Sequence, residues 1–157
     1  MLGISKNRSM IIFFKVNLKD LFLLGKHYPY PKPDCCPKCG SSRLWGHGYV
    51  PACFDGYGHP LWLKRYRCPD KGCIIRLRPE GFFKRFQATV AVIRSSIAKK
   101  VCEIKWLSGI ERNRQRHWFN ALKKRIKAYF TDTWKRNILS GFDRMMELGQ
   151  IPVSRGT

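Results

Sequence analysis

The sequence predicts an α+β protein, in which a small three-stranded zinc ribbon precedes a helical, helix-turn-helix-like bundle. Two close pairs of cysteines lie among Gly, Pro and short β-like runs in the first half of the chain. In the second half the apolar residues recur at helical spacing. The length of 157 residues suits one modest domain or two small modules.

The chain is strongly basic, since 31 Lys and Arg against 10 Asp and Glu give a net charge of +21. A short chain with this excess repels itself, and a polyanion is the usual compensation. Hydrophobic residues at 44% and charged residues at 26% are ordinary for a globular chain, so extensive disorder is not expected. So few carboxylates argue against acid–base or polynuclear metal catalysis. We therefore expect a nucleic-acid partner, no enzyme activity and no small-molecule substrate.

The chain has no membrane signal. No run approaches the roughly 20 apolar residues that a membrane-spanning helix needs. The stretch Met10–Phe14 follows Lys6 and Arg8, as in a signal peptide, but Lys15 interrupts it and no small-residue cleavage site follows. The expected location is the cytoplasm, in association with the nucleoid.

Residues 1–33 are expected to form an N-terminal segment and a linker. Prolines at positions 29, 31 and 33 favour an extended, stiff chain. The role of residues 1–28 stays open between packing on the helical half and supporting a dimer. One or two helical turns are indicated by four apolar residues: Leu18, Leu21, Phe22 and Leu24.

Residues 34–81 are expected to form the ribbon. Short strands are predicted at 44–50, 61–67 and 74–78. The Asp-Gly pair within 55–60 is a strong hairpin signal between the first two. Three short strands bury too little surface to be stable alone, so this module needs a covalent or metal staple.

The cysteines predict that staple. Cys36 and Cys39, three positions apart on a tight turn, can both reach one tetrahedral zinc ion at about 2.3 Å. Gly40 permits the left-handed backbone that directs N–H groups at the sulfurs. Cys68 and Cys73 form a second pair, separated from the first by 28 residues. Together the four thiolates would bind one zinc ion.

The second pair leaves the ligand set open. It has four residues between its cysteines, and Lys71 occupies the position where the commoner spacing has a ligand. Either Cys73 completes the site through a widened turn, or the site is degenerate and the thiols are buried without metal. A complete shell of four thiolates makes the zinc structural, whereas a catalytic zinc keeps an open position. Four other residues are candidate substitutes: Cys35, Cys53, His47 and His59.

Residues 87–149 are expected to be helical, and 150–157 a flexible tail. A first helix is indicated by Val90, Ile93, Ile97 and Val101 at i, i+3, i+7 and i+11. After a turn at Gly109, a longer helix is predicted from about 111 to 130. Thr131-Asp-Thr133 is expected to cap a last helix whose apolar residues are Trp134, Ile138, Phe142 and Met145.

The longer helix is the predicted DNA-binding element. Residues 112–127 contain seven Lys or Arg and no acid. On a helix, Arg112, Arg116 and Lys123 lie within about 40° of one another, on a face that can meet phosphates. Asn113 and Gln115 are suited to base edges; the alternative is an ordinary solvated face. The predicted first contacts are Arg112, Arg114, Arg116, Lys123 and Lys124, with Arg65 and Arg67 as auxiliary phosphate contacts.

The ribbon strands offer a second basic band, formed by Lys64, Arg65, Arg67, Arg76 and Arg78. Basic residues interleaved with aromatic ones can hold phosphates and stack bases. The neighbouring aromatics, Tyr57, Trp62 and Tyr66, therefore keep RNA or single-strand binding as an alternative, although they could equally fill the small core. A ribbon that docks a protein partner is a further alternative.

Three segments together resemble a known family: Cys36-Pro-Lys-Cys-Gly40, Arg65-Tyr-Arg-Cys-Pro69 and Arg76-Leu-Arg-Pro79. With the basic helix, they look like the N-terminal zinc-ribbon and helix-turn-helix region of insertion-sequence transposases and their short accessory proteins. The likeness covers about residues 34–130 and implies binding of duplex DNA at the element's terminal repeats. It also implies a transposase or a second copy of the chain as partner. No room remains for the RNase H-like catalytic domain, so the resemblance implies an accessory or truncated protein.

Overall fold

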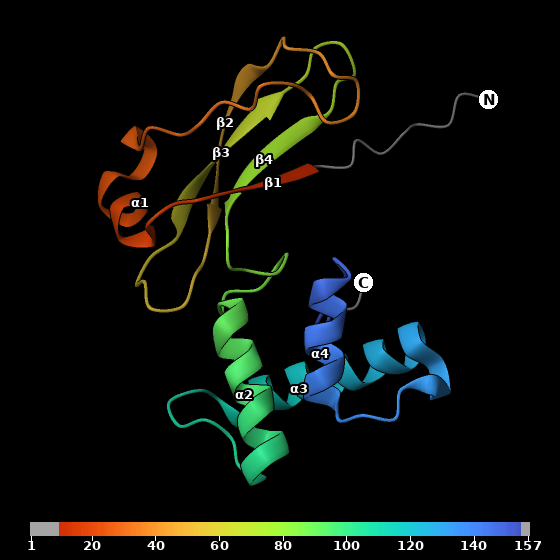
Figure 1. Ribbon diagram of the computed structural model, residues 1–157. Coiled ribbons are helices and arrows are strands. Elements are labelled where there is room, and N and C mark those ends of the chain that lie inside the picture. Colours follow the sequence, from red (N-terminus) through yellow and green to blue (C-terminus); the bar gives the residue numbers. More distant parts are fainter. Residues whose placement is uncertain (1–9, 155–157) are drawn as a thin grey trace, which may run out of the picture. The chain divides into compact units, whose positions relative to one another are not determined.

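The computed structural model describes residues 10–154 as an α+β chain, with a four-stranded mixed sheet and four α-helices (Figure 1). The chain forms two compact units, residues 1–80 and 81–157. The first, unit 1, contains the sheet and helix α1. The second, unit 2, contains helices α2 to α4. The predicted fold class is thus confirmed at the level of α+β.

The sheet has the strand order β1-β4-β3-β2. Strands β2 and β3 form the predicted antiparallel hairpin, and β3 pairs antiparallel with β4. β1 pairs parallel with β4, with Met10 opposite Ile75 and Phe14 opposite Pro79. The strands are β1 (Met10–Phe14), β2 (Trp45–Ala52), β3 (Leu61–Arg67) and β4 (Ile74–Pro79).

The fourth strand, β1, differs from the predicted three-stranded ribbon. It comes from the apolar run at the start of the chain, which covers the edge of β4 that a three-stranded sheet would leave unpaired. The next residues also belong to unit 1. Helix α1 (Leu18–Leu24) contains the predicted helical turns, and a 3-10 helix (Gly25–His27) follows it. The unit boundary therefore falls after Glu80, and not at the proline-rich segment.

One face of the sheet carries the core of unit 1. Side chains from three strands meet there, and the rings of Tyr28 and Tyr30 pack on Phe14 with centroids 6.4 and 5.8 Å away. The Tyr66 hydroxyl donates to the Pro31 carbonyl at 3.4 Å, which fixes the extended proline segment to the same face. The buried members of this core are Phe14, Cys36, Leu44, Tyr66, Cys68, Cys73, Ile75 and Leu77.

Unit 2 is built from α2 (Val90–Glu103), α3 (Arg112–Phe130) and α4 (Ile138–Glu147). The predicted apolar stripe of the first helix is confirmed, since Ile93 and Ile97 are buried and Val90 and Val101 pack against the same core. The core includes Ile93, Ile97, Trp118, Leu122, Ile126, Phe142 and Met145. Within residues 10–154 no helix is long and apolar enough to cross a membrane.

The segment 104–111 that joins α2 to α3 is longer than the three- or four-residue turn of a helix-turn-helix. Ile104 ends α2 in the left-handed conformation, with φ of 58°. Gly109 also has a positive φ, 78°, as its position in the predicted turn requires. The two helices are therefore as predicted, while their connection departs from that motif.

Helix α4 begins later than predicted. Thr131 has φ of 58°, and residues 131–133 form a 3-10 turn instead of a cap. The cap is Asn137, whose side-chain oxygen accepts from the Ser140 N–H at 2.9 Å. Trp134 lies before the helix and stacks on Phe130, with ring centroids 4.6 Å apart.

Candidate metal centre and basic surfaces

The first cysteine pair lies in a tight knuckle between the proline segment and β2. The Gly40 N–H donates to the Cys36 carbonyl at 2.8 Å, and the Cys36 N–H donates to the Ser41 carbonyl at 2.8 Å. Gly40 has φ of 72°, the left-handed conformation that the sequence predicted. These two hydrogen bonds link Cys36 to Gly40 and Ser41, the last two residues of the six-residue knuckle, and so close the turn.

The second pair lies in the same kind of knuckle, between β3 and β4. The Gly72 N–H donates to the Cys68 carbonyl at 2.7 Å, and the Cys68 N–H donates to the Cys73 carbonyl at 3.0 Å. Gly72 has φ of 66°. The backbone pattern matches the first knuckle residue for residue, so the turn is not widened. Lys71 occupies the position in the second knuckle that Cys39 occupies in the first. The second thiol, that of Cys73, comes one residue after Gly72.

The two knuckles bring together the four cysteines that the sequence predicted as ligands. The Sγ atoms of Cys36 and Cys73 are 3.3 Å apart, and those of Cys39 and Cys68 are 3.5 Å apart. Those of Cys36, Cys39 and Cys68 all lie within 4.8 Å of one another. Four sulfurs around a tetrahedral zinc stand about 3.8 Å apart, given a Zn–S bond of about 2.3 Å. The cluster therefore has the donor type to hold one metal ion: three thiols lie at this scale, and the fourth, Cys73, is next to Cys36.

The cluster is part of the hydrophobic core. Cys36, Cys68 and Cys73 are buried, and Cys39 is exposed. All seven cysteines lie in the described part of the chain and carry free thiols. Cys53, one of the candidate substitutes, is exposed, and another, His59, stacks on Phe22 with centroids 4.2 Å apart.

The thiols differ in acidity. Burial raises the pKa of Cys36, but hydrogen bonds from the Cys39 and Lys38 backbones and from neighbouring thiols outweigh it, and the pKa falls to about 6. Burial, followed by the interaction with Cys36, raises the pKa of Cys73 to about 11. One negative charge is thus favoured near Cys36, and a metal ion would supply the positive charge that further thiolates require.

A polar clasp outside the cluster joins the two knuckles. The Ser41 hydroxyl donates to one carboxylate oxygen of Asp70, and Arg43 forms an ion pair with the other at 3.5 Å. Ser41 and Arg43 come from the first knuckle and its exit, whereas Asp70 lies within the second. The cysteine cluster and this clasp therefore join the same two turns.

The basic residues of α3 divide between two sides of the helix. Arg112, Arg116, Lys123 and Lys124 are exposed, as the prediction of a phosphate-binding face requires. Arg114 lies apart from them, with its guanidinium carbon 5.1 Å from the centre of the buried Trp118 ring. The structure therefore brings together Arg112, Arg116 and Lys123, and places Arg114 elsewhere.

Gln115 does not face bases, contrary to the sequence-based interpretation. It is fully buried, and its side-chain oxygen accepts from the Ser96 hydroxyl at 2.7 Å and the Leu107 N–H at 2.9 Å. Its amide nitrogen donates to the carbonyls of Leu107 and Ile110, each at 2.9 Å. The side chain thus anchors the α2–α3 connection to the start of α3.

In the sheet, the predicted aromatic partners lie away from the arginines. Tyr66 is in the core with Ile75, and the Lys26 ammonium lies 4.3 Å from the centre of the Trp62 ring. An exposed aromatic residue on the arginine side is Trp45, which pairs with Arg67 and is 57% exposed. The alternation of side chains along a strand, applied across the hairpin register, is the signal that could have identified it.

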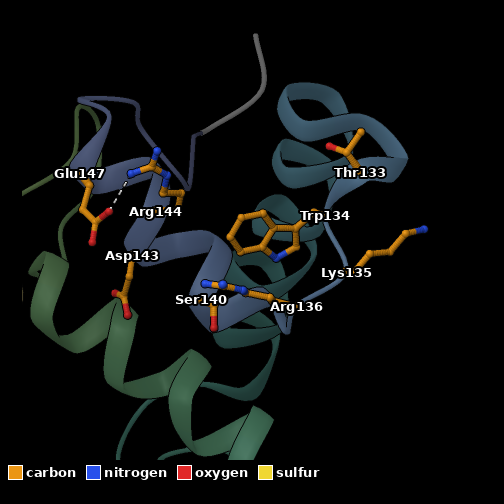
Figure 2. A pocket seen from close by; sticks show the side chains of 8 residues that line it. All are labelled: Thr133, Trp134, Lys135, Arg136, Ser140, Asp143, Arg144 and Glu147. Atoms are coloured by element: carbon orange, nitrogen blue, oxygen red, sulfur yellow. Dashed lines mark hydrogen bonds and ion pairs between the residues drawn. The ribbon is translucent and has the colours of Figure 1, made fainter.

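A pocket of about 570 Å³ lies beside α4 in unit 2 (Figure 2). Its carboxylates are engaged, because Asp143 forms a two-pronged ion pair with Arg94 at 2.8 Å and Glu147 pairs with Arg144 at 3.1 Å. The indole N–H of Trp134 donates to the Asn137 carbonyl at 3.0 Å. Both carboxylates that line the pocket are thus already paired with arginines.

Comparisons with known proteins leave the family open. No protein-family model, no curated protein and no solved structure matches the chain.

Proposed function

We propose that the protein binds duplex DNA through the exposed face of α3, and that a structural zinc ion stabilises its sheet unit. The observation that carries the proposal is the set of exposed cations Arg112, Arg116 and Lys123 on a helix without any acidic residue. A positive helix face without counter-charge suits the phosphate backbone of a duplex.

The anchoring of α3 supports this role. Buried Trp118 and Leu122 pack the inner side of the helix into the core of unit 2, and Gln115 fixes its first turn. The side chains on the outer face are therefore presented by a rigid element. A depression of about 490 Å³ runs along the helix, lined by His117, Asn120, Ala121, Lys124, Arg125, Ala128 and Ser154.

The donor set of the cysteine cluster supports zinc as the metal. Thiolates select soft or borderline ions, and four of them close a tetrahedral zinc shell without leaving a position for substrate. Bound zinc would supply folding free energy to a sheet unit with a small core. Its role in this proposal is structural, and the protein acts by binding and not by catalysis.

The two proposed parts stand in the order found in insertion-sequence transposases and their short accessory proteins. The cysteine knuckles come first and the basic helix follows. We extend the proposal to a protein of that kind, which binds DNA with a transposase or with a second copy of the chain.

Titration of a fluorescent duplex by anisotropy at two salt concentrations tests the proposal. The triple variant Arg112→Gln, Arg116→Gln, Lys123→Gln should bind at least about tenfold more weakly and flatten the log–log salt dependence by up to about 0.9 per lost phosphate contact. A control with equal charge loss replaces three exposed lysines of unit 2 outside α3, by Lys84→Gln, Lys105→Gln and Lys135→Gln. If both variants lost the same affinity for the duplex, the effect would depend only on total charge. The assignment of the binding site to α3 would then be rejected.

A further inference from the structure

The face of the sheet opposite the core carries a row of arginines. The register of β3 and β4 sets Arg65 directly opposite Arg76, and Arg67 opposite Ile74. Residues directly opposite on neighbouring strands point to the same face, with Cβ atoms about 5 Å apart. Arg78 follows two positions after Arg76 and so shares that face. Tyr66 and Ile75, which alternate with them, lie in the core.

The strands that carry these arginines, β3 and β4, and the neighbouring strand β2 contain no acidic residue. Burial, followed by the charge of Arg76, lowers the pKa of Arg78. The Nε atoms of Arg65 and Arg76 are buried, and within residues 10–154 no acceptor bonds them. Like charges directly opposite each other on neighbouring strands cost free energy, which an anion bound at this face would recover.

The guanidinium group of Arg65 lies at a bulge in β2. The pairing of β2 with β3 shifts between Gly46 and Tyr49, and Gly48 within the shift has φ of 73°. A Cβ atom added at Gly48 would lie 3.7 Å from Nη2 of Arg65. The guanidinium therefore lies over the backbone of the bulge, on the β2 side of β3.

The exposed indole ring of Trp45 continues the row of arginines at the end where Arg67 lies. Trp45 begins β2, pairs with Arg67 and is 57% exposed. At the other end of the face Leu61 and Leu63 are buried. The accessible part thus consists of Trp45, Arg67 and the Arg65–Arg76 pair. Exposed aromatic rings beside backbone-binding cations are the combination that single-stranded nucleic acids use.

The metal centre fixes the three strand ends that carry this surface. Arg67 immediately precedes Cys68, and Ile74 immediately follows Cys73, so the second knuckle sets the register of β3 and β4. Trp45 comes directly after the buried Leu44, which packs with the cysteines. The cysteines lie on the core face and the arginines on the other, so the metal would support the surface without contacting its ligand.

We propose that this arginine face binds single-stranded nucleic acid. Arg65, Arg67 and Arg76 contact the phosphates of the strand, and an unpaired base stacks on Trp45. Bases within a duplex are stacked on each other and cannot offer a face to that ring, which favours a single strand. The choice of nucleic acid as the anion rests on the proposed function, but the surface is separate from α3.

The test titrates the metal-loaded full chain with a fluorescent oligothymidylate at two salt concentrations. The double variant Arg65→Gln, Arg76→Gln should weaken binding at least tenfold and flatten the salt dependence by up to about 0.7 per lost phosphate contact. Its control, Lys26→Gln with Lys64→Gln, removes the same charge beside Trp62 and Tyr66. Trp45→Ala should weaken binding about 5- to 100-fold, and Trp62→Ala should not.

Trp45 is exposed, so its replacement tests the surface even if the arginine double variant fails to fold. Oligothymidylate affinity that falls no further in Trp45→Ala than in Trp62→Ala would overturn the inference. Loss of single-strand binding in the α3 triple variant alone would also overturn it, because α3 would then be the single-strand site. Titration of the unmodified chain with duplex DNA tests the proposed function separately. The arginine-face variants should retain duplex binding.

Discussion

The sulfur of Cys73 lies 3.3 Å from that of Cys36, although Cys73 occupies the position that Ser41 holds in the first knuckle. The two knuckles have the same backbone hydrogen bonds and the same left-handed glycine. Only the position of the second thiol differs, before the glycine in one and after it in the other. Identical turns therefore provide two ways to direct a thiol at one centre.

This equivalence predicts that the ligand can be moved. In the double variant Lys71→Cys, Cys73→Ser, the second knuckle acquires the thiol spacing of the first on an unchanged turn. We expect it to retain one tightly bound zinc ion, because the introduced thiol leaves the turn at the position that Cys39 uses in the first knuckle. Zinc content after dialysis and cobalt-substituted absorption spectra report the retention. Loss of the metal in the double variant would show that the knuckles are not interchangeable.

Removing the metal or one buried ligand should unfold the sheet unit. Structural zinc contributes roughly 10 kcal/mol or more of folding free energy to small domains, so chelation should abolish near-ultraviolet circular dichroism from the sheet aromatics. Cys36→Ser should do the same, whereas Cys53→Ser, at an exposed thiol outside the cluster, should not. A chelated chain with an unchanged spectrum would contradict a structural metal.

Much of unit 1 could be predicted from local signals. The strand at 61–67, the Asp-Gly hairpin and the left-handed Gly40 each follow from residues adjacent in sequence. The pairing of β1 with β4 could not be predicted in this way. It is a parallel contact across more than 60 residues, and an apolar run such as Met10–Phe14 fits a strand or a helix equally well.

The site was predicted less well where side-chain direction decides the outcome. Trp62 and Arg65 lie close in sequence but on opposite faces of β3, because the side chains of a strand alternate. Gln115 is polar, which suggested a base contact, yet its helical position falls on the buried stripe with Trp118. In both cases the residue type was informative, but the side of the strand or helix on which the residue lies decides its contacts.

Gln115 should therefore be a stability residue. Gln115→Leu would leave the Leu107 carbonyl and N–H and the Ile110 carbonyl without their side-chain partner, at about 1–3 kcal/mol for each group that stays buried and unbonded. We expect the free energy of unfolding in urea to fall by a few kcal/mol. Asn113→Leu, at an exposed position two residues earlier, is the control and should change it little. A similar loss of unfolding free energy in both variants would show that Gln115 does not anchor the α2–α3 connection.

The ion pair between Arg94 of α2 and Asp143 of α4 should make unit 2 sensitive to acid. The side-chain hydrogen bonds from Arg94 hold the pKa of Asp143 below its ordinary value of 3.8, against the opposing effect of burial. A carboxyl group whose folded pKa is lowered stabilises the fold at pH values above its unfolded pKa. That contribution is lost as the pH falls through about 4 and below.

The size of this effect is limited by solvent. The two side chains are 45% and 44% exposed, so the pair should contribute about 0.2–1 kcal/mol, towards the upper end because both prongs are 2.8 Å long. A double-mutant cycle with Arg94→Gln and Asp143→Asn, measured by urea unfolding, isolates the coupling. We expect it to be positive at pH 7 and to decline as the pH falls below about 4, since protonation of the carboxyl group removes its charge. A coupling that persists unchanged at the lower pH would show that the two residues interact through packing and not through charge.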